Sequence, residues 1–344
     1  MRLPAAFAAI ALIAVAPDAT IPADVPALLS SALEFTPADL ADLARGKVVK
    51  RGLHPSAAGE IAVAGAVRVA ARKELFIERL RDIERFKRGP GVLQIGRFGD
   101  HPAAGDLAPL RIGKEDFDLR RCRVGSCDIR LPADAIIRFQ REIDWKAPDA
   151  DARAASLFKQ VLADHVRAYL TGGPGRIVEY DDEKRPVRPA DDFAAVLENS
   201  PYVGAFAPGL PAHLKEPSRR LGGTDDFLYW SKERFGLTPF ITVTHVAIAQ
   251  VETGAYVVAS RDVYSSRYVD ASLSFTIASD AVGIGNAFYM VYVNRSRAYA
   301  LKGPMAGLRR SIAERRARNA LEETLRDVKE KLEREGGHVG PPLH

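Results

Sequence analysis

The last third of the chain alternates apolar and polar side chains with a period of two. Between Tyr268 and Ala278, apolar residues hold every second position, and hydroxyl-bearing or acidic residues fill the positions between them. Because successive side chains of a strand point to opposite faces, this pattern predicts a strand with one apolar and one polar face. Short turns separate similar runs, so we predict an antiparallel meander over residues 240–251, 255–261, 268–278 and 287–294.

A long charged helix is predicted to follow at residues 303–335. Its apolar seam is narrow and its first half is rich in arginine, so we expect only part of the helix to pack against a dry core. The seam consists of Leu308, Ile312, Leu321, Leu325, Val328 and Leu332.

The first hundred residues contain a strand pattern that leads directly into a helix pattern. Residues 60–69 alternate in the manner of a strand, and residues 72–87 carry apolar side chains at helical spacing. A second short strand is predicted at residues 92–98. Thr36 followed by Pro37 has the form of a helix start, with the threonine as N-cap.

The middle of the chain is predicted to be largely helical. Apolar residues recur at helical spacing over residues 132–145, 152–170 and 190–199, and residues 176–180 form a short strand pattern. Residues 200–223 are dense in proline and glycine, which predicts a long ordered loop or a lid.

This order of elements resembles the helix-grip fold of the START-like superfamily. The resemblance covers residues 60–94 and 240–332 and is one of architecture, without a short diagnostic motif. It implies an α+β fold whose antiparallel sheet curves around the long C-terminal helix, here with a largely helical insertion at about residues 99–238. It also implies a hydrophobic, often lipid-like ligand between sheet and helix, in a cavity that some members use for enzymatic cyclisation or ring hydroxylation. The chain is also similar to uncharacterised exported bacterial proteins.

The N-terminus has the form of a secretory signal peptide. Arg2 gives a positive start, residues 3–16 are apolar and rich in alanine, and Pro17 breaks the run. The run is shorter than the roughly 20 residues that span a bilayer. We therefore expect a soluble exported protein, periplasmic or extracellular. The expected segments are a signal peptide at residues 1–19, a leader at 20–59, a single domain at 60–335 and a disordered tail at 336–344.

Composition narrows the class of protein only slightly. Hydrophobic residues make up 47% of the 344 residues and charged residues 27%, which is typical of a folded globular chain. The net charge of +5 is spread along the sequence, with no basic run interleaved with aromatic residues. A nucleic-acid partner is therefore not expected.

The only two cysteines lie five positions apart and suit an exported protein. Cys122 and Cys127 flank a Gly-Ser turn that brings the thiols together. In an oxidising compartment this spacing predicts a structural disulfide. A metal site lacks a nearby histidine or cysteine to complete it, and a redox pair more usually has the spacing C-x-x-C.

Two candidate sites for acid–base chemistry stand near the start of the meander. Asp225 and Asp226 precede an aromatic cluster and suit general acid and base roles, but the favoured interpretation is a short helix capped by Thr224 or Asp225. His245 lies within a strand pattern, where it is either a catalytic or ligand-orienting group or, more commonly, a hydrogen-bonded core histidine. The remaining histidines are scattered without metal-binding spacing, so neither a metal site nor a cofactor is expected. They are His54, His101, His165, His213, His338 and His344.

Several arginines near the C-terminus suit an anionic partner. Arg295 and Arg297 lie just past the last strand pattern, and Arg309 and Arg310 lie on the helix. They predict peripheral contact with a membrane surface, although acidic residues on the same helix explain them equally well as a solvated face.

The preferred hypothesis is a non-catalytic protein that binds an apolar or amphipathic small molecule beneath its sheet, with residues 200–223 as a gate. One alternative is a hydrolase or cyclase that uses His245 with Asp225 or Asp226. Another is a non-catalytic envelope protein that acts through its C-terminal helix. The predicted ligand-binding residues are Tyr229, Trp230, His245, Tyr268, Tyr289 and Tyr292, chosen as aromatic or polar side chains able to line a mostly apolar pocket.

Overall fold

The protein is built on one antiparallel sheet of eight strands. The computed structural model describes residues 25–172, 179–219, 221–234 and 238–336. The strands follow the order β1-β2-β8-β7-β6-β5-β4-β3 across the sheet, and every neighbouring pair is antiparallel. They are β1 (Val49–Leu53), β2 (Glu60–Val69), β3 (Val92–Arg97), β4 (Thr224–Arg234), β5 (Pro239–Gln250), β6 (Tyr256–Ser265), β7 (Ala271–Asp280) and β8 (Phe288–Arg297).

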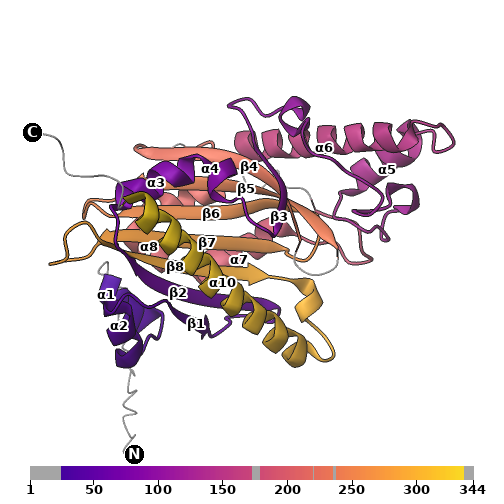
Figure 1. Ribbon diagram of the computed structural model, residues 1–344. Coiled ribbons are helices and arrows are strands. Elements are labelled where there is room, and N and C mark those ends of the chain that lie inside the picture. The colour runs from indigo at the N-terminus through magenta and orange to yellow at the C-terminus, as the bar shows by residue number, and fades with distance from the viewer. Residues whose placement is uncertain (1–24, 173–178, 220, 235–237, 337–344) are drawn as a thin grey trace, which may run out of the picture.

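Helices cover both faces of this sheet. The long helix α10 crosses the near face in Figure 1, with α3 and α4 beside it, and α7 and α8 lie behind the strands. We call the face beneath α10 the front face and the opposite face the back face. The α-helices are α1 (Val25–Ala27), α2 (Pro37–Ala44), α3 (Lys73–Arg81), α4 (Ile83–Phe86), α5 (Ala133–Glu142), α6 (Ala150–Gly172), α7 (Pro189–Glu198), α8 (Tyr202–Phe206), α9 (Leu210–Lys215) and α10 (Ala306–Gly336).

The alternation of side chains along each strand determines which of them lie on each face of the sheet. On β7 the apolar set, which includes Leu273, Phe275 and Ile277, packs on the back face against α7 and α8. The intervening Ser274 points to the front face, where its hydroxyl group lies 2.8 Å from that of Tyr292. The period of two therefore gives the central strands an apolar back face and a partly polar front face.

The back face carries two apolar clusters. One joins α7, α8 and α9 to the β7 side of the sheet and also includes Leu28, Leu29 and Leu33 of the leader. The other lies beneath α5 and α6 and includes Phe139, Phe158 and other side chains fully buried against β4 and β5. The leader residues thus join the core, and β1 extends the sheet beside β2.

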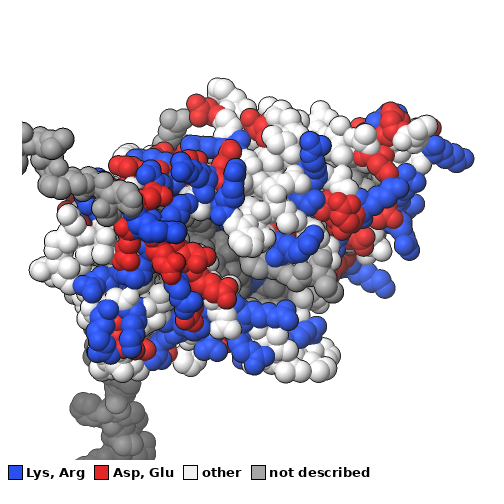
Figure 2. Space-filling view, viewed as in Figure 1, with Lys and Arg blue, Asp and Glu red and all other residues white. Residues whose placement is uncertain are grey.

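Helix α10 lies directly on β2, through Leu321 and Leu325 of its apolar seam. A methyl group built on Gly65 of β2 would lie 2.7 Å from Leu325 Cδ1 and 3.1 Å from Leu321 Cδ2. The absence of a side chain at Gly65 therefore allows the helix to approach the strand this closely. The outer side of α10 carries interspersed basic and acidic residues (Figure 2), including an ion pair of 2.7 Å between Arg326 and Glu322 one turn apart.

Most of the predicted elements are confirmed. The α+β class, the four-stranded meander, the strand at 60–69 and the long final helix all appear, with ends shifted by a few residues. Thr36 caps α2 in a complete capping box with Asp39, and Pro37 occupies its first turn. The predicted strand at 176–180 lies mostly outside the described residues, as do the predicted signal peptide and nearly all of the predicted tail.

Two predictions about the region before the meander are wrong. Thr224 to Arg234 form strand β4 and not a capped helix, because this run pairs on both sides with β5 and β3. Residues 200–223 contain α8 and α9 and so are not a loop without secondary structure. Both segments fall within the predicted insertion at residues 99–238, yet β4 is an integral strand of the sheet.

The close approach at Gly65 predicts a specific packing defect. Gly65→Val places a branched side chain against Leu321 and Leu325, so we expect the free energy of unfolding to fall by about 1–3 kcal/mol. Urea unfolding measures this change. In Gly65→Val/Leu325→Ala the two changes should partly compensate, whereas Gly285→Val, where nothing lies within 4 Å, serves as the control. Equal losses at positions 65 and 285 would contradict the contact.

Candidate functional site

A cluster of two histidines and one aspartate lies on the back face, between the two apolar clusters. Asp226 Oδ1 lies 2.8 Å from His213 Nε2 and 3.0 Å from His245 Nε2. The side chains of both histidines are almost fully buried, with 2% and 1% of their surface exposed, whereas 31% of the Asp226 side chain is exposed. The carboxylate is thus the solvent-facing member of the cluster.

Three elements bring these residues together. His245 is a back-facing residue in the middle of β5, and Asp226 lies near the start of the adjacent strand β4. His213 comes from the short helix α9, which begins directly after Gly209 in the left-handed conformation with φ of 89°. The buried Arg261 side chain donates a hydrogen bond of 2.6 Å from Nη1 to the carbonyl oxygen of Leu214 and thereby ties α9 to β6.

The second nitrogen of each histidine also has a partner. His213 Nδ1 lies 2.9 Å from the carbonyl oxygen of Arg219, which only accepts, so this nitrogen carries a proton. His245 Nδ1 lies 2.8 Å from the hydroxyl group of Tyr169 on α6. Every ring nitrogen of the pair is therefore engaged.

The electrostatics of the cluster follow from these contacts. The hydrogen bond to Asp226 raises the pKa of His213 even though burial acts against it. Burial lowers the pKa of His245, which is therefore a neutral imidazole. Burial alone would raise the pKa of Asp226, but its bonds to both histidines outweigh this and lower that pKa to about 2. The Arg219 carbonyl oxygen and the ionised Asp226 carboxylate only accept, so His213 donates from both ring nitrogens and forms an imidazolium–carboxylate pair with Asp226.

An apolar pocket of about 220 Å³ lies under α5 and α6. Phe158, Val161 and Leu162 of α6, together with Leu131 and Ala135, supply most of its apolar lining. The charged residues Asp134, Arg138 and Asp164 also line it. Three aromatic rings also line it: those of His165, Tyr180 and Tyr264, which pack against one another with centroids 6.0–6.2 Å apart.

Tyr180 and His165, which both line this pocket, have unused hydrogen-bonding capacity. The Tyr180 hydroxyl group is buried without a hydrogen-bond partner among the described residues, whereas the Tyr264 hydroxyl group donates to the carbonyl oxygen of Arg130. His165 donates from Nε2 to the carbonyl oxygen of Val263 at 3.1 Å, and burial lowers its pKa, so its Nδ1 is an unprotonated acceptor. His165 and Tyr169 are one helical turn apart on α6, so the pocket lies next to the histidine cluster.

The six predicted ligand-binding residues do not converge on one site. Tyr229 and Tyr292 lie on the front face, and Tyr229 accepts a hydrogen bond of 3.2 Å from Lys87. Trp230 and His245 lie on the back face, where Trp230 Nε1 donates to the carbonyl oxygen of Asp106.

The other two predicted residues lie elsewhere. Tyr289 is half-buried against the back-face cluster near β7. Tyr268 is exposed in the connection between β6 and β7, with φ of 67°, and its ring packs against that of Phe240.

Asp225 and Asp226, the predicted acidic pair, also lie on opposite faces of the sheet. Asp226 joins the histidine cluster, whereas Asp225 points to the other side of β4 and pairs with Arg81 of α3 at 2.7 Å. Adjacent residues of a strand face opposite sides of a sheet, so only one of the two can belong to this site.

Two of the four arginines predicted for membrane contact are already paired within the protein. Arg295 pairs with the fully buried Glu60 at 2.6 Å, and Arg297 pairs with Asp192 at 3.2 Å. Arg309 donates to the carbonyl oxygens of Lys302 and Pro304 at the start of α10. Peripheral membrane contact stays a prediction.

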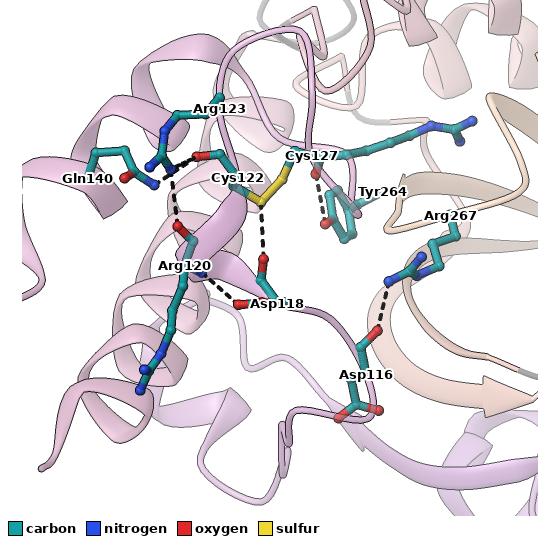
Figure 3. The surroundings of a disulfide bond; sticks show 10 residues. Asp116, Asp118, Arg120, Cys122, Arg123, Cys127, Gln140, Tyr264 and Arg267 are labelled. Carbon is teal, nitrogen blue, oxygen red and sulfur yellow. Dashed lines mark hydrogen bonds between the residues drawn. A yellow bond between two sulfur atoms is a disulfide. The ribbon is translucent and has the colours of Figure 1, made fainter. Parts of the chain in front are cut away.

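The disulfide between Cys122 and Cys127 is present and closes a small loop beside α5 (Figure 3). The carbonyl oxygen of Cys122 accepts hydrogen bonds from Gln140 at 2.8 Å and from Arg123 at 2.7 Å. The loop is thereby fastened to α5, one of the two helices that form the apolar pocket.

His213 is the residue of the cluster that the sequence interpretation missed. It lies 13 positions before Asp226 and 32 before His245, in a stretch predicted as a loop. No local spacing signals such a site, because the sheet and α9 bring the three residues together only in the folded protein. The alternative of His245 with Asp225 or Asp226 contains two of the three residues of the cluster.

Comparisons with protein family models, curated protein sequences and solved structures give no significant match to this chain. Among the described helices, none is both long and apolar enough to cross a lipid bilayer.

A half-buried carboxyl group on the front face predicts a pH effect on stability. Burial raises the pKa of Asp262 to about 6 despite its hydrogen bond from Thr244. Below pH 4 Asp262 is protonated in both states. Between pH 4 and 6 the folded protein keeps a proton that the unfolded chain loses, so stability falls as pH rises through this window.

Asp262→Asn should remove this loss and raise the free energy of unfolding at pH 7.5 by about 1–3 kcal/mol relative to the native chain. Urea unfolding at pH 4.5 and pH 7.5 measures the difference. The exposed substitution Asp100→Asn is the control. A gain of the same size at both pH values would contradict the prediction.

Proposed function

We propose that this is an exported, non-catalytic protein that binds a small apolar or amphipathic molecule in the pocket under α5 and α6. The observation that carries the proposal is the unpaired Tyr180 hydroxyl group in a mostly apolar pocket. A buried hydroxyl group without a partner costs about 1–3 kcal/mol, and a ligand that supplies the missing hydrogen bond removes that cost.

The dimensions and lining of the pocket define the class of ligand. A volume of about 220 Å³ exceeds the roughly 150 Å³ of an engineered cavity that binds benzene. It is smaller than the roughly 300–1,000 Å³ of sites for drug-sized ligands. The pocket suits one ring or a short alkyl chain with a single polar group between Tyr180 and His165.

The order of elements supports a START-like relationship as part of the same proposal. From β2 to α10 the chain forms a strand, two helices, six further strands and a closing helix, with α5 to α9 inserted between β3 and β4, and β2 lies next to β8. Members of that superfamily hold their ligand between sheet and final helix. In this chain Leu321 and Leu325 press directly on β2, and we propose that the ligand instead occupies the pocket built by the insertion.

Export is supported by the disulfide. Disulfides persist in oxidising compartments and are rare where thiols are kept reduced. The bond between Cys122 and Cys127 fastens the loop next to α5, and α5 forms part of the pocket. An oxidising compartment, which allows this bond, would therefore also favour an ordered wall of the pocket.

Filling the pocket should abolish binding. Ala168 lines the pocket, and Ala168→Leu is expected to weaken the binding of p-cresol at least tenfold in titration calorimetry, because the larger side chain occupies the space of the ring. Ala152→Leu makes the same change at an exposed position of the same helix and should leave the affinity unchanged.

Tyr180→Phe tests the hydrogen bond of the Tyr180 hydroxyl group separately from the volume of the pocket. It should weaken p-cresol binding by about 2–12-fold, the equivalent of one hydrogen bond, and leave toluene binding unchanged. If p-cresol does not bind the native chain, or if Ala168→Leu binds it equally well, the proposed function is wrong.

The hydrolase or cyclase alternative is less well supported by the geometry. His245 and Asp226 are within hydrogen-bonding distance, as an acid–base pair requires. However, Asp226 and Tyr169 engage both nitrogens of His245. Neither nitrogen is available to take a proton from a substrate in this arrangement.

A further inference from the structure

We propose that His213, Asp226 and His245 form a binding site for a divalent first-row transition-metal ion. This inference is independent of the small-molecule pocket. It concerns a different set of atoms and would hold whether or not that pocket binds a ligand.

The three ligand atoms have the spacing of a coordination shell. All of them lie within 4.8 Å of one another, and the aspartate oxygen lies 2.8 and 3.0 Å from the two Nε2 atoms. Two atoms that are each about 2.1 Å from a metal ion are about 3.0 Å apart when they subtend a right angle. The observed separations therefore suit neighbouring positions around one ion.

The outer contacts of the histidines are those of metal ligands. A metal-bound imidazole usually donates its other N–H group to a carbonyl oxygen or another oxygen acceptor. His213 Nδ1 donates to the carbonyl oxygen of Arg219 at 2.9 Å, and His245 Nδ1 lies 2.8 Å from the Tyr169 hydroxyl group. These contacts fix both rings with Nε2 directed at Asp226.

The burial pattern leaves an open side for further ligands. The histidine side chains are only 2% and 1% exposed, whereas Asp226 is 31% exposed. An ion held between them would be backed by buried imidazoles and would face solvent past the carboxylate. Catalytic metal sites keep such an open position for water or substrate, in contrast to closed structural sites.

The donor set and nearby charge indicate which ions fit. Two imidazoles and one carboxylate suit zinc, iron(II), cobalt(II) and similar ions better than calcium or magnesium, which prefer oxygen ligands. The single negative charge of Asp226 leaves a net positive site once a divalent ion is bound. The buried Arg261 side chain lies over the Tyr169 ring at 5.1 Å and adds a second positive charge. An anion or hydroxide would therefore be the favoured additional ligand.

The direct test is cobalt(II) titration of the full chain after treatment with a chelator. Visible absorption should show one equivalent of bound Co²⁺, and Co²⁺ should raise the midpoint of thermal unfolding. His213→Ala and His245→Gln should each weaken binding at least 100-fold. Asp226→Asn, at the exposed member of the cluster, should weaken it at least tenfold while the chain remains folded.

Two controls separate this site from adventitious binding. His54→Ala removes a histidine whose side chain is 88% exposed, and His338→Ala/His344→Ala removes the two histidines nearest the C-terminus. Both variants should bind Co²⁺ as the native chain does. The proposal is overturned if the native chain binds no Co²⁺ in the micromolar range. It is also overturned if folded Asp226→Asn retains native affinity, or if the C-terminal double variant alone loses binding.

Discussion

The rest of the structure depends on the burial of both faces of one antiparallel sheet. A sheet of eight strands presents two sets of side chains, and the period of two assigns each residue to one face without exception along a regular strand. On the front face, α10 and α3 cover the apolar side chains of β2 and their neighbours. On the back face, the leader and the helices between β3 and β4 cover a larger apolar surface.

Specific contacts hold the polar groups at the junction of the two back-face clusters, although the Arg261 Nε atom has no hydrogen-bond partner among the described residues. A buried charge is strongly unfavourable unless it is paired and hydrogen-bonded. Arg261 is 1% exposed, packs on the Phe193 ring at 3.7 Å and donates to the carbonyl oxygen of Leu214. The same arrangement holds α9 on the sheet and directs His213 toward Asp226. Residues that support the fold and residues that could bind a ligand are therefore in direct contact at this junction.

The sequence predicted most of the sheet and little of the site. The alternation in β7 and the apolar seam of α10 are local patterns. Such patterns predict an element correctly when the folded protein buries its apolar side chains as expected. The prediction of a short helix capped by Thr224 or Asp225 is wrong because pairing with β3 and β5 overrides the local capping signal. The partnership of His213 with Asp226 and the Tyr169 contact of His245 depend on segments 13 to 76 residues apart. No periodicity in the chain encodes contacts of that range.

The histidine cluster is the polar centre of the back face, and we propose that it holds a metal ion. Anomalous diffraction at the cobalt absorption edge, from crystals grown with Co²⁺, shows whether an ion lies there. One ordered peak bonded to Nε2 of His213, Nε2 of His245 and the Asp226 carboxylate is expected. A map with no peak at this position, and with the three side chains still hydrogen-bonded to one another, would rule out the metal site.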